Sequence, residues 1–137
     1  MSVLELNGRI FDASTTGTLT LTGEGGAATT DVTQGLGKSW ANYTSDTTTA
    51  YRDSFNFGSI TDNGTGDTTH TFTNAMSNND YSVVSSASAA ETGTGSLGGS
   101  QHPRTYATGS FVIVTSTEGG SLADRPLINN AILGNLA

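Results

Sequence analysis

Cysteine is absent from the 137-residue chain, so no disulfide can hold its fold together. Proline occurs only twice, and charged residues make up just 12% of the sequence. Disordered chains are usually rich in proline and charge and contain few β-branched residues. Threonine, which is β-branched and suits a pleated, half-solvated surface, is abundant instead. The composition therefore predicts an ordered, all-β protein.

Large apolar side chains are also scarce, because hydrophobic residues make up only 34% of the chain. A small β domain with a thin core buries too little surface to offset easily the ~1–2 kcal/mol of backbone entropy that each ordered residue costs. Disulfides are excluded, and the His, Asp and Glu residues show no convincing metal-ligand spacing. We expect an obligate oligomer or a subunit of a larger assembly, with no cofactor.

Basic residues are few and scattered, with 5 against 12 acidic residues and a formal net charge of −7. Because there is no basic patch to replace phosphate counterions, we expect no nucleic-acid binding. We also expect no membrane insertion, since no apolar stretch approaches the ~20 residues of a spanning helix. The first residues lack the basic and apolar regions of a secretory signal, which predicts synthesis in a cytoplasm.

Residues 1–35 differ in pattern from the rest of the chain and are interpreted as an N-terminal attachment arm. A short apolar run ends at the turn pair Asn7-Gly8, and residues 18–22 alternate strictly between threonine and leucine. The apolar side chains of this segment need a neighbour to pack against. The candidate attachment residues are Val3, Leu4, Leu6, Ile10, Phe11, Leu19 and Leu21.

Residues 36–137 have the pattern of one β domain. Trp40 and Tyr43 fall in one predicted strand, and the alternation around Phe55 and Phe57 places both on one face of another. Asn63-Gly64 lies in the strongest turn signal, residues 61–67, which predicts a hairpin with a return strand over residues 68–72. Residues 81–84 predict a further strand.

The C-terminal half contains one long loop and the most apolar strand. Residues 85–103 are mostly small and polar, which predicts a long surface loop of the kind that often binds partners. The unbroken apolar run at residues 111–114, which predicts a strand within residues 104–117, indicates burial on both faces. Residues 127–133 fit a helical turn or a strand, and their short length favours a closing strand. No heptad repeat predicts a coiled-coil shaft.

Catalytic chemistry has little support in the sequence. His70 and His102 lie far apart; in a symmetric trimer three histidines could meet on the axis and bind an ion, although ordinary packing is the simpler interpretation. A glycosidase needs two carboxylates at a fixed separation, whereas Asp62, Asp67 and Asp80 lie in predicted turns. No serine has an obvious His and Asp partner. We therefore predict no catalytic, cofactor-binding or metal-binding residues.

Several motifs occur in a distinctive order between residues 34 and 84. They are Gln34-Gly35-Leu36-Gly37-Lys38-Ser39-Trp40-Ala41-Asn42-Tyr43, Arg52-Asp53-Ser54-Phe55-Asn56, Ser59-Ile60-Thr61-Asp62-Asn63-Gly64-Thr65-Gly66-Asp67, Phe72-Thr73-Asn74-Ala75-Met76 and Asn79-Asp80-Tyr81-Ser82-Val83-Val84. In these motifs the chain resembles a family of small virion structural or tail-fibre-like proteins of tailed, especially marine, bacteriophages. Residues 2–7 and 131–135 resemble the two ends of that family, and the likeness fades between residues 85 and 118.

The resemblance implies a homotrimer of antiparallel β-sandwich-like domains, with the N-terminal arm attaching each knob to the particle. It supplies no catalytic residues. The residues expected in the core or the trimer interface are Trp40, Tyr43, Phe55, Phe57, Phe72, Val83, Phe111 and Ile113.

Three functions remain open on these grounds, all on the virion surface after synthesis in the host bacterial cytoplasm. The favoured one is a capsid decoration or cement protein whose residues 1–35 bind the major capsid protein or another virion protein. The second is a short tail fibre or fibre tip that binds a host surface glycan or protein receptor through residues 85–103. The third, a polysaccharide-degrading tailspike, is disfavoured because no carboxylate pair stands out.

Overall fold

The structure is a computed structural model that describes residues 3–6, 9–12, 20–22, 29–31, 35–90 and 101–137. The chain divides into two compact units, Met1–Leu36 and Gly37–Ala137. In the first unit, two pairs of short antiparallel strands are formed by β1 (Val3–Leu6) with β2 (Arg9–Asp12) and by β3 (Thr20–Thr22) with β4 (Thr29–Asp31). The second unit contains the described core.

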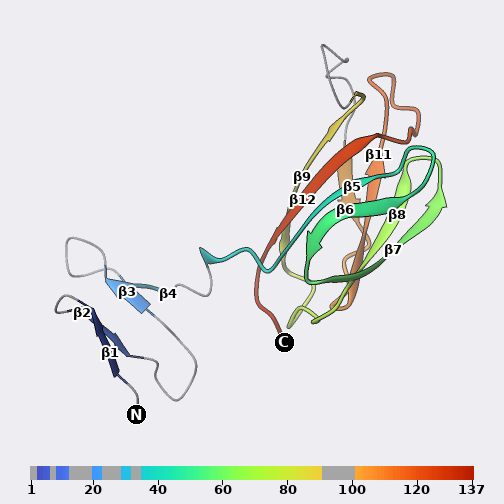
Figure 1. Ribbon diagram of the computed structural model, residues 1–137. Helices are drawn as coiled ribbons and strands as arrows, with labels where there is room; N and C mark the ends of the chain where they lie inside the picture. The colour runs from blue at the N-terminus through green and yellow to red at the C-terminus, as the bar shows by residue number, and fades with distance from the viewer. Residues whose placement is uncertain (1–2, 7–8, 13–19, 23–28, 32–34, 91–100) are drawn as a thin grey trace. The chain divides into compact units, whose positions relative to one another are not determined.

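Two four-stranded antiparallel sheets form the second unit (Figure 1). Sheet I has the strand order β6-β5-β12-β9, and sheet II has the order β10-β11-β8-β7. Their strands are β5 (Ser39–Thr44), β6 (Ala50–Phe55), β7 (Phe57–Gly64), β8 (Asp67–Phe72), β9 (Ser82–Ser88), β10 (Gln101–Arg104), β11 (Ser110–Thr115) and β12 (Leu127–Leu133). The prediction of an all-β, antiparallel, sandwich-like domain is confirmed.

The core forms because alternate residues of facing strands point into the space between the sheets. One cluster of buried side chains contains Phe72, Met76, Tyr81, Phe111, Ile113 and Ile132, with Phe57, Val83 and Tyr106 packed against it. A second, smaller cluster contains Ala41, Tyr43 and Ile128, with Tyr51, Phe57, Ile60 and Ala87 around it. Half-buried Phe57 belongs to the surroundings of both clusters and so joins them.

A corner at Asn56 carries the chain from sheet I to sheet II. Asn56 has a φ of 60°, and its side chain donates to the carbonyl oxygens of Lys38 and Asn74 at 3.0 and 3.1 Å. The corner ends β6 at Phe55 and begins β7 at Phe57. The prediction that these two phenylalanines share one face of one strand is therefore wrong, because the alternation continues in sequence across a change of sheet.

The predicted hairpin is present between β7 and β8, with its turn at Thr65-Gly66, two residues later than Asn63-Gly64 suggested. Gly66 occupies the turn with a φ of 67°, and its carbonyl accepts from the Thr115 amide at 2.8 Å. A Cβ at this position would lie 2.4 Å from the Thr115 carbonyl oxygen, so only glycine fits. The turn thereby fixes the hairpin against the end of β11.

In the C-terminal half, two strand predictions are confirmed and one loop prediction needs correction. The strand predicted at residues 111–114 is confirmed as β11, and a separate short strand, β10, ends at Arg104, with Thr105 at a φ of 52° in the connection between them. The predicted loop over residues 85–103 is shorter, since β9 extends to Ser88 and β10 begins at Gln101; residues 91–100 lie outside the described residues. The closing strand is confirmed as β12, which lies between β5 and β9.

Candidate functional site

The most distinctive surface of the second unit is a row of apolar side chains across the outer face of sheet I. In the strand register, Trp40 pairs with Phe55 on one side and Ala131 on the other, and Ala131 pairs with Val84. These residues, called here the apolar row, come from all four strands. Phe55, Trp40 and Val84 are 54%, 43% and 58% exposed, respectively, and Ala131 is also exposed.

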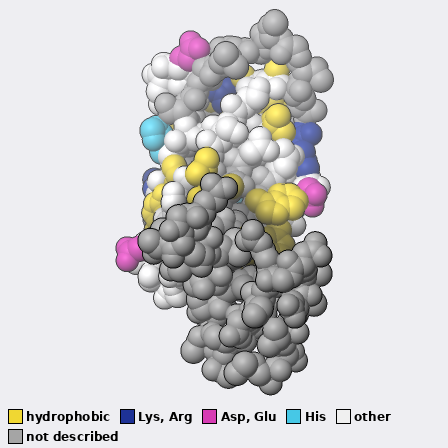
Figure 2. All heavy atoms as spheres, turned by 90° about the vertical axis from the view of Figure 1, so that its left-hand side faces the viewer, with side chains coloured by type: hydrophobic (Ala, Val, Ile, Leu, Met, Phe, Trp, Pro, Cys, Tyr) yellow, Lys and Arg dark blue, Asp and Glu magenta, His cyan; other side chains and the backbone are white. Residues whose placement is uncertain are grey.

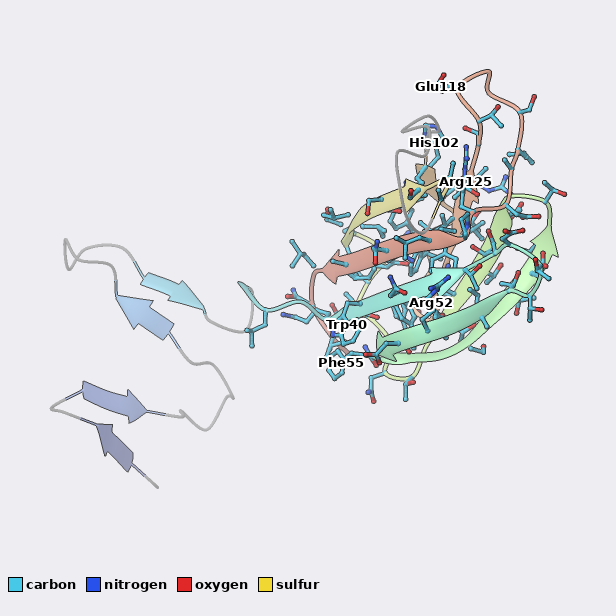
Figure 3. All side chains as sticks on the ribbon, turned by 45° about the horizontal axis from the view of Figure 1, so that its top comes forward. Trp40, Arg52, Phe55, His102, Glu118 and Arg125 are labelled. Atoms are coloured by element: carbon cyan, nitrogen blue, oxygen red, sulfur yellow. The ribbon has the colours of Figure 1, made fainter. Side chains whose placement is uncertain are left out.

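The aromatic end of the apolar row can be seen in Figure 3. In Figure 3, Trp40 and Phe55 lie next to one another on β5 and β6, while His102 and Glu118 lie toward the opposite end of the sandwich. Figure 2 shows hydrophobic side chains reaching the surface among polar ones. Leu133, which is 42% exposed, lies two residues beyond Ala131 on the same face of β12 and widens the apolar row.

A polar row follows the apolar one along sheet I. Asn42 pairs with Asp53 and with Asn129, and its amide donates to the Asn129 side chain at 2.6 Å. The strand register shifts next to Asn42, and Arg52 lies at this shift on β6. Its guanidinium donates to the Pro126 carbonyl at 2.8 Å. The outer face of sheet I thus combines an apolar half with a half that bears amides, a carboxylate and a guanidinium.

A hydrogen-bonded chain of polar groups links the sheets inside the sandwich. From sheet I, Tyr43 contacts the Thr68 hydroxyl of sheet II at 3.2 Å, and Thr68 contacts His70 Nε2 at 3.2 Å. His70 Nδ1 lies 3.0 Å from the Tyr51 hydroxyl of sheet I, which donates to the Ser59 carbonyl at 3.0 Å. Because Tyr51 donates to that carbonyl, it accepts from Nδ1–H, and Nε2 accepts from Thr68.

Burial sets the charge state of this internal chain. The His70 side chain is fully buried and stacks on Phe111, with ring centroids 5.1 Å apart. Desolvation lowers the pKa of His70 to about 3, so its imidazole is neutral at neutral pH. Desolvation also raises the pKa of the Tyr43 and Tyr51 hydroxyls above their ordinary value. The link between the sheets is therefore uncharged.

Asn130 adds another polar group to the same interior from β12. Its side chain lies near enough to the Tyr43 hydroxyl to oppose part of the burial effect on the Tyr43 pKa. Its Nδ2 and Oδ1 atoms are nevertheless buried without a hydrogen-bond partner of good geometry among the described residues. Asn130 is held in place by its strand, because its backbone pairs with Ala41 of β5 and Ser85 of β9.

The structure distributes the predicted core or interface residues over two environments. Tyr43, Phe72, Phe111 and Ile113 are buried between the sheets, and Phe57 and Val83 are half-buried beside them. Trp40 and Phe55 instead lie together on the outer face of sheet I. The two sets are on opposite sides of that sheet.

The candidate arm residues cannot be placed in the same way. Leu19 lies outside the described residues. For the others, Val3, Leu4, Leu6, Ile10, Phe11 and Leu21, the structure describes backbone strands and not side chains.

The described His, Asp and Glu side chains do not gather into a metal-ligand set. Within the described residues, no group of three or more His, Cys, Asp or Glu side chains could hold a metal ion. His70 is sealed in the core and so cannot reach a symmetry axis, which overturns the idea of an axial ion held by that histidine. His102 is exposed on β10. In the part of the chain that the structure describes, no helix is long and apolar enough to cross a membrane.

Sequence reasoning missed the polar row and the internal polar chain. The alternation of Trp40 with Asn42 signalled that one strand face carried both, and the pattern of residues 127–133 gave Asn129 and Ala131 to one face. No comparable signal marked His70 as a link between sheets, because its partners come from strands distant in sequence.

Comparison with protein families, curated proteins and solved structures found no match to this chain.

Proposed function

We propose that the chain is a non-enzymatic structural protein of a bacteriophage particle. In this proposal it forms a homotrimer on the virion surface and decorates the capsid. The observation that carries the proposal is the apolar row, because an exposed apolar surface on a small sandwich marks a binding face rather than a catalytic one. The resemblance of residues 34–84 to phage virion proteins supplies the biological setting.

In this proposal the two units of the chain have different roles. The sandwich is the knob, and residues 1–35 are the arm that binds the major capsid protein or another virion protein. The few apolar residues of this segment give it the chemistry for such a contact. His70 links the two sheets and faces no solvent, which supports a structural rather than a catalytic role for this histidine.

A tail fibre or fibre tip is the second candidate, and one observation favours it. Trp40 and Phe55 present two exposed aromatic rings beside the Asn42 and Asn129 amides, and sugars bind to surfaces that combine stacking rings with hydrogen-bonding amides. A fibre of this kind would bind a host surface glycan. Loss of glycan binding in Trp40→Ala, with no change in copy number per particle, is the result that this alternative requires.

The copy number of the chain in purified virions tests the proposal. Quantitative mass spectrometry against the major capsid protein should give a number that scales with the capsid lattice, and deletion of residues 1–35 should abolish attachment of the recombinant protein to undecorated heads. A number matching the few positions of a tail would replace the head assignment by the fibre. Absence from purified virions would refute both.

A further inference from the structure

The apolar row is a continuous patch of exposed hydrophobic side chains rather than a single exposed residue. Leu122, which is 51% exposed, lies outside the described strands, whereas the members of the apolar row follow one another through direct strand pairing. Single exposed apolar side chains are normal on soluble proteins, but contiguous patches mark interaction sites. The row therefore calls for a partner surface of matching chemistry.

The composition of the row narrows the type of partner. The aromatic end, Phe55 and Trp40, could stack on a sugar, but Ala131, Val84 and Leu133 continue the surface with aliphatic groups. Aliphatic side chains offer a hydroxyl-rich ligand no hydrogen bonds, and their burial is favourable against another apolar surface. A protein surface fits the whole row better than a glycan does.

The row contains no charged residue, although the chain carries a net charge of −7. Its nearest acidic neighbour in the register is Asp53, one outward position along β6 from Phe55. A highly charged partner would find no complementary charge in the row, whereas two copies of the same neutral row can meet without placing like charges opposite each other.

The interior gives an independent reason for self-association. Only nine hydrophobic residues are buried in the core described for the second unit, and its middle is occupied by a polar chain around His70. A domain of this size buries a modest share of its surface, so further apolar burial between copies would add substantially to its stability. Sheets of this kind pack face to face about 10 Å apart.

We propose that the outer face of sheet I is the self-association interface, and that the apolar row of one copy packs against the apolar row of another. This inference deepens the proposed homotrimer and rests on that proposal only for the number of copies. Two copies would place the rows face to face, and three would bring them together around a threefold axis.

The single tryptophan of the chain is a built-in reporter, because Trp40 lies within the row. Sedimentation equilibrium and tryptophan emission would be measured on the full chain over a wide range of concentrations. The mass should be a multiple of 14.0 kDa that falls on dilution, and the emission should shift to longer wavelength in the same concentration range as Trp40 becomes exposed. Coincidence of the two curves places the contact at the row.

Three variants complete the test. Phe55→Ser and Val84→Ser should each raise the dissociation constant at least tenfold while circular dichroism stays that of a β protein, since both side chains are exposed. Leu122→Ser is the matched control, because it removes an equally exposed hydrophobic residue elsewhere, and should leave the constant unchanged. Equal weakening by all three variants would overturn the proposal.

Other outcomes also decide the matter. A single copy with exposed Trp40 at every concentration would overturn the inference, and a single copy with covered Trp40 would do so too, because the chain itself would then cover the row. A dimer would support the interface and contradict the homotrimer. Self-association through the row in a protein absent from virions would leave the inference standing and refute only the proposed function.

Discussion

The two sheets of the sandwich differ in how the apolar side chains on their outer faces are covered. On sheet II, half-buried Val112 and Val114 point outward from β11. The Arg104 side chain from β10 forms an ion pair with Asp67 of β8, and β11 lies between those two strands. The ion pair therefore crosses the outer side of β11. On sheet I the apolar row has no such covering among the described residues.

This contrast shows two ways to handle apolar residues on the outside of a sandwich. Long polar side chains can lie over them and cover their methyl groups with aliphatic stems, and the Arg104 side chain, which crosses β11 to reach Asp67, is placed to do so. Alternatively the residues stay exposed and are covered by another molecule. The outer face of sheet II therefore has the features of a solvent-facing surface, whereas the outer face of sheet I has those of an interface.

The largest effect is expected from the shared interior. Phe111→Ala removes a fully buried ring that contacts His70, Phe72 and Tyr81, and should lower the free energy of unfolding by about 3–5 kcal/mol. Phe55→Ala removes a ring of equal size from the outer face, and its effect should be confined to association. Urea unfolding at several protein concentrations measures both.

The dependence on concentration separates the two variants. Phe111→Ala should be less stable than wild type at every concentration. Phe55→Ala should match wild type when both are dilute and fall below it only where wild type associates. If Phe55→Ala were as destabilised as Phe111→Ala in dilute solution, the ring would be part of the core, and the distinction between the faces of sheet I would fail.

The difference between these two phenylalanines also marks what the sequence could predict. Alternation identified a strand containing Phe55, an unbroken apolar run identified one containing Phe111, and the composition predicted an all-β protein. Local pattern says which residues share a face, but it does not say whether that face meets a second sheet or solvent. That depends on pairings between distant residues such as Trp40 and Ala131, and on a corner at Asn56 where the polarity pattern runs on unbroken.

The polar link between the inner faces should make stability depend on pH. His70 has a pKa of about 3 in the fold, against an ordinary value of 6.5. The unfolded chain therefore binds more protons between these values, and the free energy of unfolding should fall as pH drops. The expected loss is about 2 kcal/mol between pH 7.5 and 5, above the range where most carboxylates titrate. Urea unfolding across this range gives the slope.

Substitution of the two histidines assigns the slope. His102→Gln changes the exposed histidine and should keep the full pH dependence, whereas His70→Gln should flatten it. Because His70→Gln also disturbs the links to Thr68 and Tyr51, nuclear magnetic resonance of the wild-type protein supplies a second measurement. An imidazole signal of His70 that titrates near pH 6.5 in the folded protein would contradict its burial between the sheets.

The candidate site was less predictable than the fold for the same physical reason. Trp40 and Phe55 were identified as core or interface residues because large aromatic rings are usually covered by something. Their joining with Ala131 and Val84 into one row requires the order β6-β5-β12-β9, which brings the C-terminal strand between β5 and β9. Neither residue spacing nor the motifs contain that order, so the row becomes visible only once the strands are paired.

The smallest effect is expected from the ion pair on sheet II. Arg104→Ala should lower the free energy of unfolding by no more than about 1 kcal/mol, because the Arg104 side chain is 55% exposed and salt and water screen such pairs. Part of that loss should persist at high salt, since the arginine stem also covers β11. Arg104→Lys, which keeps a cation and an aliphatic stem, is the matched control and should lose less stability.

If Arg104→Ala left stability unchanged and did not increase binding of a hydrophobic dye, Arg104 would not be covering Val112 and Val114. Sheet II would then tolerate exposed apolar residues without a partner, which would weaken the argument that the row on sheet I needs one.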